Sequence, residues 1–303
     1  MSERIDILPA RPAIETLEAG CLRAWAPAKI NLNLLVDPRR ADGFHPLDSF
    51  VARVTFYDRL DFAPRQDGQI RLACSGPDCG DVAQNLALRA ARLLADGRTV
   101  AGVDIELTKS IPPGRGLGGG SSDAASTLVA LNRLWDLGLD AAPLAAMAAK
   151  LGSDVPLFLS SPAVRMTGRG ELLEPISVHP FVALLLIPDF ACGTAGVYRV
   201  FDESPAAAWT QLDPAVLADP PSKWRSRLAN HLAPAAQDVC EPLKGLWAEF
   251  SASMADLEMP VHLTGSGSAL FALCDDASEA ATAMTSLPQG LRRLCVAVTA
   301  CTA

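Results

Sequence analysis

The sequence has few of the residues that build metal sites and disulfide frameworks. It contains four histidines, none at the spacing of metal ligands, which argues against a zinc module. It also lacks any Cys-x-x-Cys pair, and several of its eight cysteines lie inside apolar runs such as Leu270 to Cys274. That placement is typical of buried, reduced thiols. The sequence therefore predicts neither a zinc site nor a disulfide scaffold.

An excess of positive charge is also missing, as are long apolar runs. The net charge is −8 and the pI is near 5.0, whereas a protein that binds nucleic acid needs a basic face to displace counterions. No run reaches the length of a membrane span, and the first twenty residues contain acids but no apolar core of a signal peptide. We therefore expect a cytoplasmic protein without nucleic-acid or membrane partners, as a monomer or weak homodimer.

The length and apolar content predict more than one hydrophobic core. With 303 residues and 50% hydrophobic content, the chain is long enough for two lobes. Residues 1–20 are rich in proline, alanine and acids, and predict a flexible N-terminal extension or a loosely docked arm. The glycines and prolines of 162–180 indicate a boundary, so we expect lobes at 21–170 and 171–303.

Strand and helix patterns interleave along the whole chain. Apolar residues alternate over 24–36, opposite a polar face that carries Lys29, Asn31 and Asn33. Helical spacing follows over 85–94, a strand pattern over 103–107, and two helical patterns over about 123–137 and 142–151. Ser121 or Ser122 is a candidate N-cap for the first of these two helices. The fold class predicted is α+β.

A glycine-rich segment between a predicted strand and a predicted helix is the strongest functional signal. Because glycine allows positive φ and a close approach of the backbone, successive N–H groups can surround an anion at the start of the helix. The segment lacks the Gly-Lys-Ser/Thr ending of a Walker A loop, and a flexible linker is the alternative. The predicted ATP-binding residues are Pro112, Pro113, Gly114, Arg115, Gly116, Leu117, Gly118, Gly119, Gly120, Ser121 and Ser122.

Three segments in order resemble the motifs of the galactokinase, homoserine kinase, mevalonate kinase and phosphomevalonate kinase superfamily. They are 26–32 (APAKINL), 112–125 (PPGRGLGGGSSDAA) and 263–269 (LTGSGSA). The resemblance implies a two-lobed kinase, with an N-terminal lobe like ribosomal protein S5 domain 2 and a ferredoxin-like C-terminal lobe. It also implies ATP as the phosphoryl donor with Mg²⁺; the sequence assigns no metal ligand.

Two further segments resemble the branch of this superfamily whose acceptor alcohol carries cytidine diphosphate. They are 40–45 (RADGFH) and 151–156 (LGSDVP). By resemblance, Phe44 and His45 contact the cytidine, since an aromatic ring stacks on a pyrimidine and imidazole can hydrogen-bond its edge. Phenylalanine stands where many members carry tyrosine, so a hydroxyl contact is absent. The alternative for Phe44 is a loop aromatic that covers its own turn.

Lys29 and Asp154 are the predicted catalytic pair. Phosphoryl transfer needs a group that accepts the proton of the attacking hydroxyl and positive charge on the transferred oxygens. The resemblance gives the first role to Asp154 and the second to Lys29. The alternatives are a helix N-cap for Asp154 and a solvated strand lysine for Lys29.

Weaker matches concern four other side chains. Asn31 and Thr194 are predicted to contact the acceptor alcohol, and Asn85 the adenine; each is also a candidate cap or strand-end hydrogen bonder. Arg115 replaces a small residue of the family's loop, and either reaches a phosphate or points to solvent.

Four functions are compatible with these features. The first is the kinase of a cytidine-diphosphate alcohol, and the second is another kinase of the superfamily, acting on mevalonate, homoserine or a sugar. The segment 42–45 (DGFH) favours the first. An ATP sensor without catalysis is disfavoured by the presence of Lys29 and Asp154, and an RNA-associated module by the acidic balance.

Overall fold

The computed structural model describes residues 7–8, 10–11, 13–203 and 212–301, which form two β-sheets flanked by helices. The larger sheet has the order β1-β2-β4-β6-β5, and β3, β7 and β8 extend it beside β4. Its strands are β1 (Ile14–Thr16), β2 (Leu22–Asn31), β3 (Leu35–Val36), β4 (Leu47–Arg65), β5 (Ile70–Ser75), β6 (Gly102–Thr108), β7 (Ala163–Gly168) and β8 (Leu172–Pro175). Only β5 and β6 pair in parallel; the other pairs of this sheet are antiparallel.

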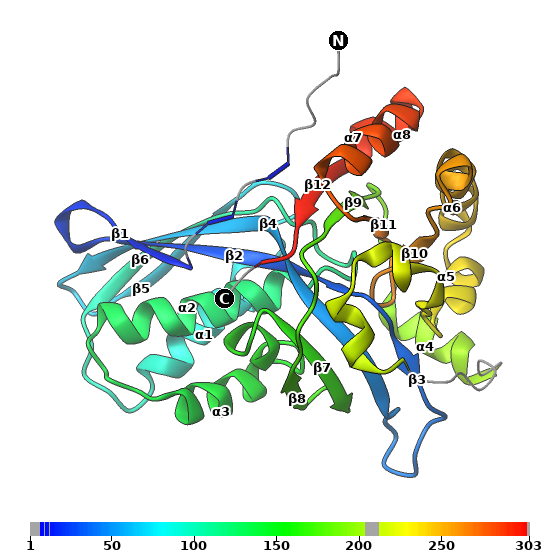
Figure 1. Cartoon of the computed structure of the whole chain (residues 1–303). Coiled ribbons are helices and arrows are strands. Elements are labelled where there is room, and N and C mark those ends of the chain that lie inside the picture. The colour runs from blue at the N-terminus through cyan, green and yellow to red at the C-terminus, as the bar shows by residue number, and fades with distance from the viewer. Residues whose placement is uncertain (1–6, 9, 12, 204–211, 302–303) are drawn as a thin grey trace.

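The long strand β4 connects the parts of this sheet. Its first half pairs with β7 and its second half with β6, while β2 runs beside it through a register shift at Pro27 and Ala28. Helices α1 (Leu86–Ala95), α2 (Gly119–Leu134) and α3 (Ala141–Leu151) lie together beneath β2 and β4 in the view of Figure 1. Their apolar faces bury a core with the sheet, which contributes roughly 25 cal/mol per Å² of apolar surface removed from water.

The smaller sheet belongs to the second half of the chain and is wholly antiparallel. Its order is β10-β11-β9-β12, made of β9 (Val182–Leu186), β10 (Val261–Leu263), β11 (Leu270–Cys274) and β12 (Cys295–Thr299). All five residues of β9 are buried, as their unbroken apolar sequence requires. The flanking helices are α4 (Thr194–Glu203), α5 (Ala233–Val239), α6 (Glu241–Met254), α7 (Ala277–Ser286) and α8 (Gln289–Leu294) (Figure 1).

Two lobes around two sheets confirm the predicted α+β architecture. The predicted boundary at 170 falls in the turn between β7 and β8, so the first sheet reaches Pro175. Of the predicted extension, residues 1–6, 9 and 12 lie outside the described part, whereas Ile14–Thr16 form β1 against β2. No helix of the described residues is long and apolar enough to cross a membrane.

Two local predictions were wrong. Neither Ser121 nor Ser122 caps α2, because Gly118 at φ 72° turns the chain earlier and both serines lie in the first helical turn. Cys74 and Cys79 form a disulfide in place of reduced thiols. The tight turn after β5, which includes Gly76 and Gly80 at positive φ, places their Cα atoms 5.9 Å apart.

His262 is a buried titratable group that makes stability depend on pH. It lies in β10 with its ring centroid 5.4 Å from that of Phe271, and its Nε2 is buried without a hydrogen-bond partner. Burial lowers the pKa of His262 to about 4, against a backbone hydrogen bond at Arg225 that raises it. Its contribution to stability is therefore present above pH 6.5 and is lost as the pH falls toward 4.

We expect His262→Gln to remove most of this acid sensitivity. For the parent protein, the loss at this site is on the order of 3 kcal/mol of unfolding free energy. Urea unfolding at several pH values between 4 and 7 measures the difference between parent and variant. His179→Gln is the matched control, because the His179 ring bonds only the neighbouring Pro180 carbonyl. Parallel pH profiles for the parent and His262→Gln would contradict this account.

Candidate active site

The glycine-rich segment forms the connection from β6 to α2. Gly114, Gly116 and Gly118 all have positive φ, between 71° and 77°. A Cβ added at Gly116 would lie 2.1 Å from the Thr264 carbonyl oxygen, so only glycine fits there. The loop ends at the first turn of α2, where free N–H groups and the helix dipole favour an anion.

The three sequence motifs meet through hydrogen bonds between their backbones and side chains. The Asn31 N–H donates to Thr264 Oγ1 at 3.0 Å, and that hydroxyl donates to the Gly116 carbonyl at 3.3 Å. The Lys29 N–H donates to the Leu117 carbonyl at 2.9 Å. The loop is therefore held between β2 and the turn that joins β10 to β11.

Lys29 lies buried at this junction. Its Nζ donates to Asn31 Oδ1 at 2.5 Å, and an added Cβ at Gly265 would lie 3.3 Å from the same Nζ. Burial lowers the pKa of Lys29, while the charge of the Asp154 carboxylate acts in the opposite direction. An ammonium with so little water around it is strongly attracted to an anion. The alternative of a solvated lysine is excluded by its 5% exposure.

Asp154 and Lys29 line one cavity of about 410 Å³. Asp154 precedes a short 3₁₀ helix, η3 (Pro156–Leu159), whose N-cap residue is Val155 and has no side-chain capping hydrogen bond. Of the other predicted residues, the same cavity is lined by Asn31, Gly116, Gly118, Ser121 and Thr194. The Asp154 carboxylate, the Lys29 ammonium and the glycine loop thus line the same cavity.

A second cavity of about 390 Å³ contains Phe44 and His45 and shares Leu47, Arg169 and Tyr198 with the first. The Arg169 guanidinium lies 4.3 Å above the Phe44 ring, and Phe44 is 51% exposed. His45 faces two acceptors: Nδ1 is 3.0 Å from the Asp37 carbonyl and Nε2 is 3.1 Å from Asp202. Both ring nitrogens therefore already have partners within the protein, and the ring edge is occupied.

Three arginines line this second cavity, Arg39, Arg169 and Arg199, together with one carboxylate, Asp202. Arg169 also pairs with Asp42 at 2.8 Å, and Arg39 lies 3.7 Å from Asp202. Tyr198 adds an aromatic ring whose centroid lies 5.3 Å from that of His45. Guanidinium groups bind phosphate oxygens in pairs and aromatic faces stack on bases, so the cavity has the chemistry for a nucleotide.

Other predicted residues have partners within the protein. Asn85 caps α1, because its side chain accepts from the Ala87 N–H. The next residue, Leu86, lies near the glycine loop, since a Cβ added at Gly120 would be 3.7 Å from Leu86 Cδ1. Arg115 does not line the cavity; it is partly buried and donates to the carbonyls of Pro113, Pro188 and Asp189. Thr194 Oγ1 lies 2.8 Å from Ser266 Oγ.

A buried cluster of charge beneath the loop was not predicted. Lys109 donates to Asp58 and, at 2.6 Å, to Asp123 in the first half of α2. Asp58 also accepts from the N–H groups of Ser110 and Ile111, where the loop begins. Burial and the neighbouring Asp58 raise the pKa of Asp123 to about 8, against the effect of Lys109. The cluster fixes both ends of the loop to β4.

The described residues offer no group of three or more histidine, cysteine or acidic side chains for a metal ion. ATP reaches kinases as its magnesium complex, so this ion belongs to the substrate. Ser121 lines the cavity, and its hydroxyl is an oxygen donor of the kind that Mg²⁺ prefers. Ser122 and Asp123 are buried and do not line the cavity, and Asp123 pairs with Lys109.

Comparison with known proteins agrees with this geometry. The family model described as GHMP kinases N terminal domain matches residues 85–161, which include the glycine loop and Asp154. A homoserine kinase from Cytophaga hutchinsonii superposes with a TM-score of 0.69 at 16% identity, covering 95% of this chain and 96% of the other, and supports the fold alone. The fold and the meeting motifs define a small-molecule kinase of the GHMP class.

More similar relatives identify the branch. The 4-diphosphocytidyl-2-C-methyl-D-erythritol kinase of Salinibacter ruber is 38% identical over 278 residues, covering 88% of this chain and 95% of the relative. That of Pseudomonas paraeruginosa is 37% identical over 277 residues, covering 88% and 90%. A crystal structure of 4-(cytidine 5'-diphospho)-2C-methyl-D-erythritol kinase superposes with a TM-score of 0.75 at 34% identity, covering 92% and 99%. The chain belongs to the 4-diphosphocytidyl-2-C-methyl-D-erythritol kinase family.

Proposed function

We propose that the protein transfers the γ-phosphoryl group of ATP to the 2-hydroxyl of 4-diphosphocytidyl-2-C-methyl-D-erythritol, a step of the non-mevalonate route to isoprenoid precursors. One observation carries the proposal. The cavity of Lys29 and Asp154 adjoins a basic, aromatic cavity, and the two share Arg169 and Tyr198. A substrate that carries both a reacting hydroxyl and a nucleotide group needs two adjoining cavities, one for each part of the molecule.

The donor side is the glycine loop. Its amides and the first turn of α2 supply fixed positive dipoles for the triphosphate, and Lys29 supplies a buried charge beside them. The three glycines at positive φ keep the backbone close to the cavity. Mg²⁺ is proposed to enter the site bound to ATP. The proposed location of the protein is the cytoplasm, where ATP is abundant.

The acceptor side is the arginine-lined cavity. Arg39, Arg169 and Arg199 are suited to the diphosphate, and the exposed ring of Phe44 offers a face to the cytosine. His45 is held by Asp37 and Asp202, so its proposed role is to shape this cavity. Asn31 and Thr194 line the path toward Lys29.

The reaction is a direct displacement at phosphorus. The acceptor hydroxyl oxygen forms a bond to the γ-phosphorus while the bond from that phosphorus to the β,γ-bridging oxygen breaks, and ADP leaves. Asp154 takes the proton of the hydroxyl, and Lys29 neutralises charge on the transferred oxygens. Both side chains line the same cavity, as this step requires.

We expect a strong preference for the complete cytidine-bearing alcohol. With ATP and Mg²⁺, kcat/KM for free 2-C-methyl-D-erythritol should be lower by about 10⁴, because the arginines and aromatic rings then bind nothing. A coupled assay of ADP release over this alcohol, mevalonate and homoserine measures the preference. Comparable turnover of mevalonate or homoserine would refute the substrate.

An arginine pair provides the control for this experiment. Arg169→Gln removes a guanidinium that lines both cavities, and should raise KM for the cytidine-bearing alcohol without changing KM for ATP. Arg165→Gln is the matched control: Arg165 lies in β7, just before the turn that contains Arg169, but it pairs with Asp48 and lines neither cavity. It should behave like the parent. Equal effects of the two substitutions would show that the second cavity does not hold the substrate.

A further inference from the structure

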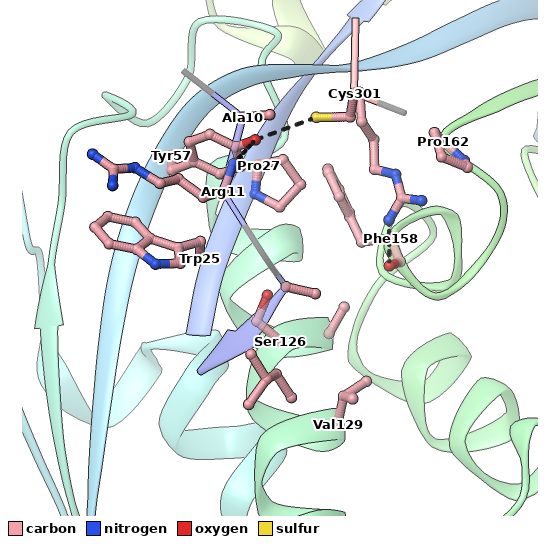
Figure 2. Close-up of a pocket in the computed structure, with 14 residues that line it drawn as sticks. Ala10, Arg11, Trp25, Pro27, Tyr57, Ser126, Val129, Phe158, Pro162 and Cys301 are labelled. Atoms are coloured by element: carbon pink, nitrogen blue, oxygen red, sulfur yellow. Dashed lines mark hydrogen bonds between the residues drawn. The ribbon is translucent and has the colours of Figure 1, made fainter. Parts of the chain in front are cut away.

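A third cavity, of about 570 Å³, shares no lining residue with the two described above. It lies between the N-terminal segment around Arg11, strands β2 and β4, and helix α2. Figure 2 shows Trp25, Pro27 and Tyr57 on one side of it, Ser126 and Val129 on α2 opposite, and Phe158 at its end. Its volume is in the range of sites for small organic ligands, about 300 to 1,000 Å³.

The lining combines apolar and aromatic surface with positive charge. Trp25, Tyr57 and Phe158 supply rings, and Arg11 and Arg53 are the charged members of a lining that includes no acidic residue. The Arg11 guanidinium lies 4.9 Å from the centre of the Trp25 ring. Arg53 Nε is buried without a hydrogen-bond partner, and burial lowers the pKa of Arg53. A ligand with an apolar body and one negative charge matches these groups.

Contacts link this cavity to the catalytic groups. Arg53 is the cross-strand partner of Lys29, and it donates to the carbonyls of Phe158 at 3.1 Å and Ser160 at 2.9 Å. A Cβ added at Gly118 would lie 2.9 Å from Phe158 Cζ and 3.1 Å from Lys29 Cγ. The Phe158 ring therefore packs between the glycine loop and the third cavity. Phe158 also belongs to η3, which follows Asp154 closely in the chain.

We propose that this third cavity binds a small amphipathic carboxylate, a planar apolar body with one acidic group, and that the ligand slows phosphoryl transfer. The apolar body lies against Trp25, Tyr57 and Val129, and the carboxylate accepts from Arg53. Such a ligand competes for the guanidinium that now holds the carbonyls of Phe158, in η3, and of Ser160, which follows η3. It thereby loosens the segment between Asp154 and Phe158 without occupying either substrate cavity. The effect is on kcat and leaves KM for ATP unchanged.

The test uses 2-naphthoate as the probe and neutral 2-naphthamide as its matched control. Isothermal titration of the full-length protein should give one site for naphthoate and binding weaker by about tenfold or more for the amide, since the carboxylate makes a charge-assisted bond. Saturation with a non-hydrolysable ATP analogue should leave the naphthoate affinity unchanged. In steady-state assays, naphthoate should lower kcat.

Two substitutions fill the cavity. Val129→Trp, and independently Ser126→Phe, should abolish naphthoate binding and inhibition while the kinase activity without naphthoate stays at the parent level, because neither side chain lines the substrate cavities. The proposal is overturned if naphthoate does not bind, if the amide binds equally well, if the nucleotide analogue displaces the probe, or if a folded filled variant still binds it. Binding without any change in kcat would overturn the coupling to η3.

Discussion

Asp154→Asn should lower kcat by about 10² to 10⁴, the scale for loss of a positioned general base. The amide keeps the size of the side chain but cannot take the proton of the hydroxyl. KM for ATP should change little, because the loop and Lys29 that bind the phosphates remain. Steady-state kinetics with the cytidine-bearing alcohol measure both constants.

Asp140→Asn is the matched control for this substitution. Asp140 precedes α3 without a side-chain capping bond, and it lies in neither substrate cavity. Its removal should leave kcat at the parent value. A parent-like kcat for Asp154→Asn would remove the carboxylate from the reaction and reduce its role to that of a local structural residue.

Gly116→Ala should reduce kcat/KM for ATP by about 10² or more, because a displacement of about 1 Å in a catalytic loop costs that much. Gly116 has φ of 77°, and the added methyl carbon would lie 2.1 Å from the Thr264 carbonyl oxygen. That oxygen belongs to the backbone of the neighbouring motif and cannot rotate away. The loop must therefore move, and the contact between Thr264 and the Gly116 carbonyl is lost with it.

Gly245→Ala separates this effect from a general response to a glycine substitution. Gly245 lies inside α6, where an added Cβ meets nothing within 4 Å. Alanine should stabilise that helix by about 1 kcal/mol and leave the kinetics unchanged. Thermal unfolding and ATP kinetics should be measured on both variants. If Gly116→Ala binds ATP as tightly as the parent, the loop does not hold the phosphates.

Local patterns carried most of the information about secondary structure. The helical spacing at 85–94 corresponds to α1, with Asn85 as its N-cap, and the alternation at 103–107 corresponds to β6. The predicted strand at 24–36 was too long, because β2 ends at Asn31 and β3 resumes only at Leu35. The side chains of Asn31 and Asn33 make hydrogen bonds there. Asn31 Nδ2 donates to Ser49 Oγ, and Asn33 Oδ1 accepts from the Phe50 N–H.

The local sequence pattern does not predict the buried charge cluster. Asp58 lies in the middle of the long strand β4, and its partners Lys109 and Asp123 come from β6's end and from α2. Its only sequence trace is a lysine directly before the glycine loop, which also suits a solvated position. Contacts between the three motifs likewise depend on chain folding, since Asn31 and Thr264 are separated by 233 positions. The disulfide depends on a turn whose geometry the sequence around Cys74 does not specify.

A crystal structure with a non-hydrolysable ATP analogue and the cytidine-bearing alcohol would show whether the glycine loop and Asp154 act on the two substrates. We expect the γ-phosphate between the amides of 116–120 and Lys29 Nζ, with the acceptor hydroxyl about 2.6 to 3.2 Å from an Asp154 oxygen. The cytosine should lie against Phe44, and the diphosphate beside Arg169. A triphosphate bound away from the glycine loop, or an Asp154 carboxylate turned out of reach of the hydroxyl, would contradict this expectation.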